Sequence, residues 1–94
     1  TNTIVGILRL IEIGGSGNNT LDVKIQSDTS GFSSPSDRLT FTQLNQGSGA
    51  THEVITATGP AGSDNIWRVV VTIAGAGSRS FKFAVGFGYY VTSG

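Results

Sequence analysis

Apolar and polar residues alternate at every second position over much of this chain, and this alternation limits the fold more than any other feature. The stretch TLDVKIQS at residues 20–27 shows it most clearly, and SFKFAVGF at residues 80–87 repeats it. A period of two is the period of a β-strand with one buried face, and no segment shows the 3.6-residue period of a helix. The sequence therefore predicts an all-β protein.

Turn-forming residues divide the alternating stretches from one another. We predict strands over residues 3–13, 20–27, 39–45, 52–58, 66–74 and 80–87. Short strands at this spacing favour a β-sandwich or barrel. We predict a single small antiparallel β-sandwich, jelly-roll-like, with six to eight strands, occupying residues 1–94 as one domain without a tandem repeat. Residues 1–19 form either an N-terminal arm or an edge strand.

The two strands at residues 66–74 and 80–87 are rich in large apolar side chains. A short Gly-Ala-Gly-Ser segment joins them, so we predict a hairpin over residues 66–88 that holds the two sheets of the sandwich together. The expected core aromatic residues are Phe41, Trp67, Phe81, Phe83 and Phe87.

The charge composition and the length of the apolar runs each argue against one class of partner. Six basic and six acidic residues give a net charge of zero, and the basic residues are scattered along the sequence. Such a chain does not attract a phosphate backbone at long range, so we expect no nucleic acid partner. No apolar run approaches the roughly 20 residues of a membrane span, and we expect no membrane partner.

Few residues offer reactive chemistry. His52 is the only histidine and stands beside Glu53, but no G-x-S-x-G or similar signature supplies a nucleophile. The absence of cysteine excludes disulfides and thiolate metal sites. Asp28, Asp37 and Asp64 lie in loops or at their ends without the alternating pattern of a calcium loop, and Asp28 and Asp64 are expected to cap turns. We predict no enzyme, no catalytic residues, no metal and no cofactor.

Three aromatic residues stand outside the expected core. Phe32 lies in a polar loop, and Tyr89 and Tyr90 are adjacent, so both cannot point into one core. Exposed aromatic side chains are good interface anchors and equally suit stacking against a sugar. Phe32, Tyr89 and Tyr90 are therefore candidate interface residues, while a third reading has the tyrosines close the end of the sandwich.

The order of four motifs resembles a family of small β-sandwich proteins that decorate or cement the capsids of tailed bacteriophages. The motifs are LDVKIQSD, LTFTQLNQGSGA, the strand RVVVTI and the ending FKFAVGFG, within residues 20–88. In that family the second and third strands are often joined by a short turn followed by tryptophan. Here the longer segment SDTSGFSSPSD takes its place, with Phe32 as the aromatic residue.

The resemblance implies a non-enzymatic viral structural protein on the outer capsid surface of the virion. Its expected partners are the major capsid protein and further copies of itself, most often as a trimer. The family offers no catalytic residues to transfer. A tail or fibre component of the virion and a carbohydrate-binding β-sandwich module are the alternative functions.

Overall fold

The chain folds into two antiparallel β-sheets packed face to face. The computed structural model describes residues 2–29, 31–49, 51–58 and 66–91, and at residues 2 and 89–91 the backbone alone. In this part of the chain there is no helix, and hence none that could cross a membrane. The all-β sandwich predicted from the alternation is confirmed. Its strands are β1 (Asn2–Gly14), β2 (Thr20–Asp28), β3 (Ser36–Thr40), β4 (Leu44–Asn45), β5 (Thr51–Thr58), β6 (Ile66–Ala74) and β7 (Ser80–Val91).

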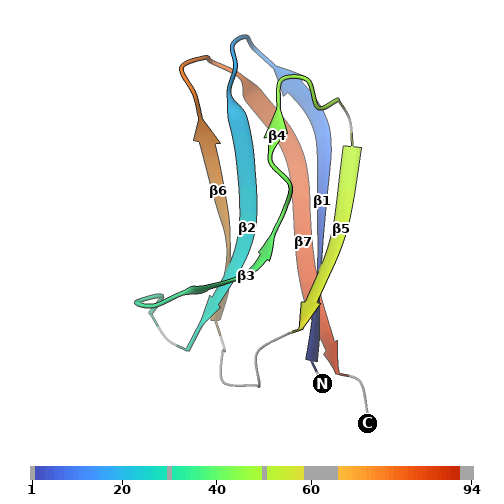
Figure 1. The fold of residues 1–94 in the computed structure, drawn as a ribbon, viewed down its shortest axis with the longest axis vertical. Coiled ribbons are helices and arrows are strands. Elements are labelled where there is room, and N and C mark those ends of the chain that lie inside the picture. Colours follow the sequence, from blue (N-terminus) through green and yellow to red (C-terminus); the bar gives the residue numbers. More distant parts are fainter. Residues whose placement is uncertain (1, 30, 50, 59–65, 92–94) are drawn as a thin grey trace.

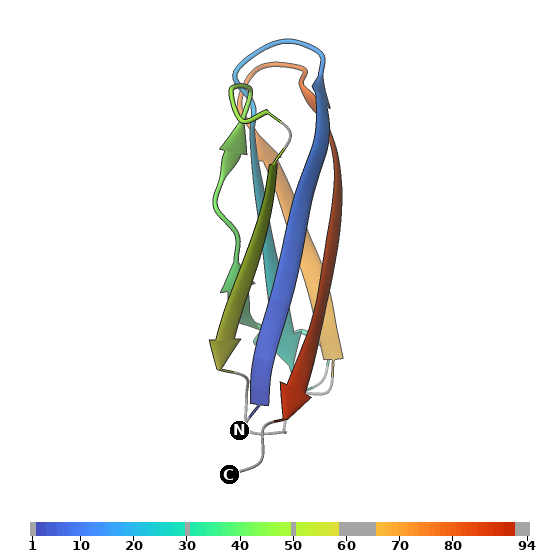
Figure 2. The same ribbon diagram turned by 90° about the vertical axis from the view of Figure 1, so that its right-hand side faces the viewer.

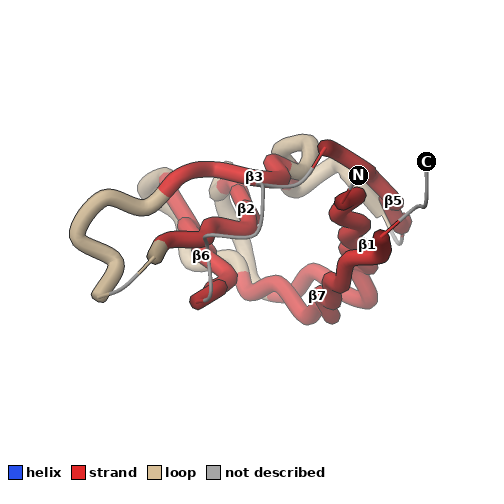
Figure 3. The backbone as a smooth tube through the Cα atoms, turned by 90° about the horizontal axis from the view of Figure 1, so that it is seen from below, coloured by secondary structure: helices blue, strands red, loops and turns tan. Residues whose placement is uncertain are grey.

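Each sheet is built around one of the first two strands. The first sheet has the order β5-β1-β7, and in the second β2 lies between β6 on one edge and β3 and β4 on the other. Figure 1 shows the strands along the long axis, and Figure 2 shows β5, β1 and β7 in front of β2 and β6. Viewed from below in Figure 3, β2, β3 and β6 form one layer and β1, β5 and β7 the other.

The first strand is central, which corrects the expectation of an N-terminal arm or edge strand. β1 pairs with β5 on one edge and with β7 on the other along nearly its whole length. Its inward residues Ile4, Leu8 and Leu10 are 1–3% exposed. Because both edges and one face of β1 are covered, this strand organises its sheet.

The hairpin predicted over residues 66–88 does not form. β6 pairs with β2 in one sheet, and β7 pairs with β1 in the other. The link at residues 75–79 therefore crosses from sheet to sheet and makes an arch, as does the link at residues 15–19 between β1 and β2. Alternation defines the strands but does not tell a hairpin from an arch, because both connect two strands of the same pattern.

Hydrogen bonds between the two links explain why they form arches. The Ser78 N–H donates to the Ser16 carbonyl at 2.8 Å. The buried Asn19 side chain accepts from the Arg79 N–H at 2.9 Å and donates to the Ala74 carbonyl at 3.2 Å. The Arg79 guanidinium donates to two carbonyls of the first link, those of Gly15 and Gly17. Each link thus supplies the partners that the other needs.

Glycine is required where the links touch. Gly17 has a φ of 111°, and a Cβ atom there would lie 2.4 Å from the Cα atom of Gly77. A Cβ atom on Gly77 would meet the Gly17 Cα atom at 2.6 Å. Only residues without a side chain permit this contact between backbones.

A structural repeat of two segments that are distant in the sequence accompanies the paired arches. Residues 11–25 and 71–85 share the pattern of an apolar strand end, a Gly-x-Gly link and an alternating strand, with identical strand and link boundaries. If β1 is exchanged with β6 and β2 with β7, the pairing β1–β7 becomes the pairing β6–β2 and the reverse, so the same two pairings result. The two copies are identical only at Ile13 and Ile73, Gly15 and Gly75, and Gly17 and Gly77, and elsewhere share mainly the apolar character of alternate strand positions, which hides the repeat in the sequence.

The core lies towards the first four strands. Its buried members are Ile4, Leu8, Leu10, Leu21, Val23, Ile25, Leu39, Phe41 and Leu44. Phe41 is in the core as expected, whereas Trp67, Phe81 and Phe83 are partly buried against it and Phe87 is 40% exposed. The placement of Phe87 in the core was wrong, because β6 and β7 form the less covered side of the sandwich.

The predicted strand at residues 39–45 is two strands with a break. β3 ends at Thr40 and β4 begins at Leu44, close to the irregularity expected near Gln43. The break lets Leu39, Phe41 and Leu44 all point into the core despite their mismatched spacing.

Candidate interaction surfaces

The first surface is the open side, defined by β6, β7 and the space between them. In the described part of the chain, β6 pairs with β2 alone and β7 with β1 alone. Residues paired across antiparallel strands project to the same face. The partners of the buried core residues therefore form two inward apolar rows, which are Trp67, Val69, Val71 and Ile73 on β6 and Phe81, Phe83, Val85 and Phe87 on β7.

These inward rows are incompletely covered. Val71 is 44% exposed and Ile73 is 50% exposed, although their partners Val23 and Leu21 are each 1% exposed. The rings of Trp67 and Phe87 meet across the sandwich with centroids 5.7 Å apart. Above that contact the two rows present apolar surface to solvent.

The second surface is the closed side, defined by β3, β4 and β5. Glu53 projects inward from β5, because its neighbour across the sheet is the buried Leu8. Its carboxylate reaches the break between β3 and β4, where it accepts from the Thr42 N–H and the Thr42 hydroxyl, both at 2.8 Å. These bonds tie the two sheets together along this side.

The third surface is the flat face, which is the part of the outward side of the β5-β1-β7 sheet nearest the start of β1. It consists of Thr3, Val5, Ile7, Val54, Thr56, Thr58, Gly86 and Gly88, none of them charged, whereas Arg9, Glu12 and Lys82 project from the same side further along the strands. Ile7 and Val54 are cross-strand neighbours and are 48% and 55% exposed. No atom lies within 4 Å of a Cβ built on Gly86 or Gly88, so this part of the face is level and open.

The flat face ends in an open hollow of about 460 Å³ beside the irregularity in β1. Ile7, Ile11 and Val54 line it together with Arg9 of β1 and His52 of β5, which are cross-strand neighbours. The register of β1 against β7 shifts between Leu10 and Glu12, which leaves Ile11 without a partner in that ladder and 46% exposed. An apolar surface thus continues from the flat face to the hollow.

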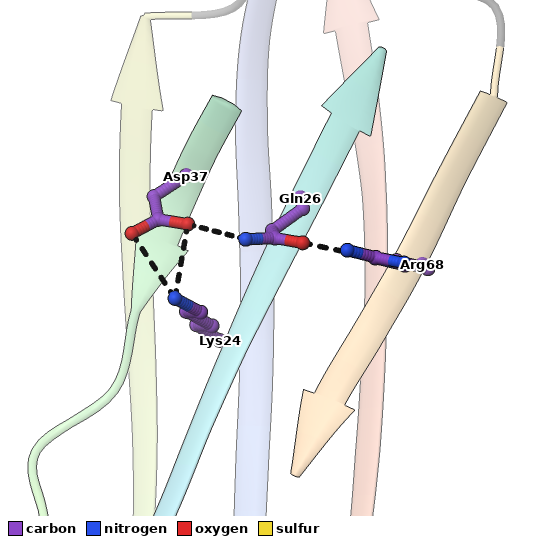
Figure 4. A network of polar contacts seen from close by, with 4 residues as sticks. All are labelled: Lys24, Gln26, Asp37 and Arg68. Atoms are coloured by element: carbon purple, nitrogen blue, oxygen red, sulfur yellow. Dashed lines mark hydrogen bonds and ion pairs between the residues drawn. The ribbon is translucent and has the colours of Figure 1, made fainter. Parts of the chain in front are cut away.

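A polar network crosses the outer face of the other sheet (Figure 4). Arg68 donates to Gln26 at 2.9 Å, and Gln26 donates to Asp37 at 2.7 Å. Lys24 forms an ion pair with Asp37 at 3.3 Å. The hydrogen bond from Gln26, followed by that from Lys24, lowers the pKa of Asp37 below its usual value. The network joins β6, β2 and β3 side by side.

The three aromatic residues named from the sequence do not form one described cluster. Phe32 has a φ of 51° and lies half-buried under the Arg68 guanidinium, whose Cζ atom is 4.5 Å from the ring centroid. Tyr89 and Tyr90 continue β7 opposite Ile4 and Thr3, and their side chains lie outside the described residues. Phe32 therefore serves to hold its loop against β6.

The residues considered for catalysis and metal binding are separated by the strands. His52 and Glu53 are consecutive on β5 and so point to opposite faces, with Glu53 bonded to Thr42. Asp28 caps its loop, as expected, by accepting from the N–H groups of Thr29 at 2.7 Å and Ser34 at 3.0 Å. No group of three or more metal-ligating side chains occurs among residues 2–29, 31–49, 51–58 and 66–91, and Asp64 lies outside them.

Comparison with protein-family models, with curated proteins and with solved structures gives no match to this chain. Sequence reasoning missed the open side, since the alternation of β6 resembles that of a fully covered strand. One usable signal was present. Residues 66–91 contain no acidic residue and no proline, and their inward positions are entirely apolar. These strands therefore lack the inward charges and the proline that often protect a sheet edge, although Arg68 and Lys82 lie on their outward side.

Proposed function

We propose that this chain is a non-enzymatic structural protein that decorates the outer surface of a tailed-bacteriophage capsid and stabilises the shell. The flat face carries the proposal. It offers the capsid an uncharged, level surface on a rigid sheet whose central strand is covered on both edges. Contiguous exposed apolar surface of this kind is typical of protein–protein interaction sites.

The resemblance of residues 20–88 to capsid decoration proteins supports the same function. Exposure of Ile7 and Val54 at the centre of the flat face suits contact with another protein, because apolar side chains in the middle of an interface contribute most when they lose water. A decoration protein binds in many copies, so weak contacts at each copy add up across an oligomer. The major capsid protein is the proposed partner.

Co-sedimentation with capsids tests this function. Shells of the virus that encodes the chain, prepared without it, are mixed with the purified protein, and bound copies per shell are measured. We expect saturation at a number set by the shell symmetry. Absence of binding by the folded wild-type protein would contradict the proposal.

Two variants identify the face that binds. Val54→Asp places a charge at the centre of the flat face and is expected to weaken binding at least about 10-fold, since an unpaired charge resists loss of water. Thr40→Asp places the same charge at an exposed position of β3, opposite Lys24 on the outer face of the other sheet, and should bind like wild type. Equal binding by both variants would exclude the flat face.

A further inference from the structure

We propose that the open side binds the open side of a second copy of this chain, with β6 of one copy pairing antiparallel with β7 of the next. This proposal deepens the proposed function by naming the surface between copies. It rests on the uncovered edges and rows of β6 and β7, and its tests use the purified protein without capsids.

The paired arches show what kind of structure fits the open side. β1 and β2 form one arch, and their remaining edges are covered by β5 and by β3 and β4 respectively. β6 and β7 form the equivalent arch, and their remaining edges have no partner among the described strands. The missing elements are therefore strands. All described strands of the chain already have positions in the two sheets, so we infer that strands of a second copy cover the open side.

The directions of the strands allow two copies to supply each other. β6 and β7 run in opposite directions (Figure 1). Rotation about an axis parallel to the strands therefore brings β6 of one copy beside an antiparallel β7 of its neighbour. Around a twofold or a threefold axis this pairing closes on itself and leaves no free edge on either strand.

The chemistry of the open side is compatible with itself. The inward rows carry no charge, and Arg68 and Lys82 are in outward positions, opposite Gln26 and Glu12 respectively. The contact between Trp67 and Phe87 marks the level at which β6 and β7 lie beside each other. At that level Arg68 faces Gly86, four residues or about 14 Å from Lys82, which exceeds the screening length of about 8 Å at physiological salt.

The size of the surface is adequate. β6 has nine residues and is about 30 Å long at about 3.4 Å per residue. Two strands and the space of about 10 Å between the sheets give a width of about 20 Å, so the contact covers about 600 Å² per copy. Stable protein–protein interfaces bury about 1,200–2,000 Å² in total, so two copies at about 600 Å² each reach the lower end of that range. Backbone hydrogen bonds along two strand pairs add to this apolar contact.

Sedimentation of a matched pair of variants is the first test. We expect the wild type to sediment at two or three times the 9.7 kDa mass of the chain. Val71→Glu places a charge in the inward row and should raise the Kd of self-association at least about 100-fold, because that charge would be buried without a partner. Thr72→Glu places the same charge on the outward side, level with Lys82 of the neighbour, and should sediment like wild type.

Disulfide cross-linking is the second test and does not depend on the Val71 variant folding. The chain has no cysteine, so Thr72→Cys and Lys82→Cys are made as separate single variants at exposed outward positions. The level of Trp67 and Phe87 puts residue 72 of one copy opposite residue 82 of the next. We expect a covalent dimer when the two variants are mixed and oxidised, and little when each is oxidised alone.

The proposal would be overturned if the folded wild-type protein sedimented as a single copy at high concentration. The concentration should be about 100 times that used to check its folding by circular dichroism. Cross-linking of Thr72→Cys with itself in preference to the mixture would also overturn the proposal, since that result would pair β6 with β6. Failure of the capsid experiment would leave these results unaffected, which separates the copy-to-copy surface from the capsid-binding function.

Discussion

The closed and open sides of the sandwich begin from equivalent arches and end in different surfaces. On the closed side, β3 and β4 are short and broken, and Glu53 points inward and bonds to the break. On the open side, β6 and β7 are continuous, with inward rows that are wholly apolar. Natural sheets use short strands and inward charges to keep edges from pairing. The comparison shows that this chain breaks and charges the inward side of one pair of edges and leaves the inward side of the other pair continuous and apolar.

Val23 of β2 and Val71 of β6, which are cross-strand neighbours in one sheet, offer the sharpest test of that difference. Val23 is 1% exposed and Val71 is 44% exposed, although both point inward. Val23→Ala should lower the free energy of unfolding by about 2–3 kcal/mol through lost burial and a cavity, and Val71→Ala by less than about 1 kcal/mol. Urea unfolding measures both, at a concentration where the chain sediments as one copy. Equal losses would mean that the open side is as well packed as the core.

Removing the inward carboxylate tests the protection of the closed side. Glu53→Ala leaves the N–H and hydroxyl of Thr42 without their acceptor, which should cost about 1 kcal/mol in unfolding free energy. It should also increase aggregation, because β5 loses its inward charge. Glu53→Gln keeps an acceptor oxygen and is the control. A variant with unchanged stability and solubility would show that the break in the strand suffices.

The smallest expected effect is a dependence on pH confined to the sheet that contains β3. The hydrogen bond from Gln26 and the contacts with Lys24 lower the pKa of Asp37, so its contribution to stability is present above the unfolded value of 3.8. That contribution is lost as the pH falls through the lower pKa of the folded state. Thermal unfolding between pH 5 and pH 2 should decline less steeply for Asp37→Asn than for wild type. If thermal stability declined equally steeply in both proteins, Asp37 would not contribute to the pH dependence of stability.

The sequence predicted the strands well and their partners poorly. Alternation is a local property, so the bounds of β6 were predicted to the residue and those of β2 to within one. The choice between hairpin and arch depends instead on hydrogen bonds between residues about 60 positions apart, such as that of Arg79 with Asn19. No local pattern records such a contact.

The residues of the proposed interaction surfaces differ from the candidate interface residues chosen from the sequence. Phe32 was chosen because it is an aromatic residue in a polar loop, and the structure places Arg68 over its ring. The flat face escaped notice because Ile7, Val54 and Gly86 come from three separate strands and meet only in the sheet. The exposure of Val71 depends on how much of β6 the opposite sheet covers, and alternation within β6 does not record that.

The paired arches also limit when, during synthesis of the chain, the two sheets can be completed. β1 and β2 precede the other described strands in the sequence, yet they complete their pairing only with β7 and β6, which follow all the others. Contacts between such distant segments close slowly, and partly made sheets expose strand edges that invite aggregation. Neither sheet can therefore be completed until residues 66–91 have been synthesised, and both can then close at the same stage.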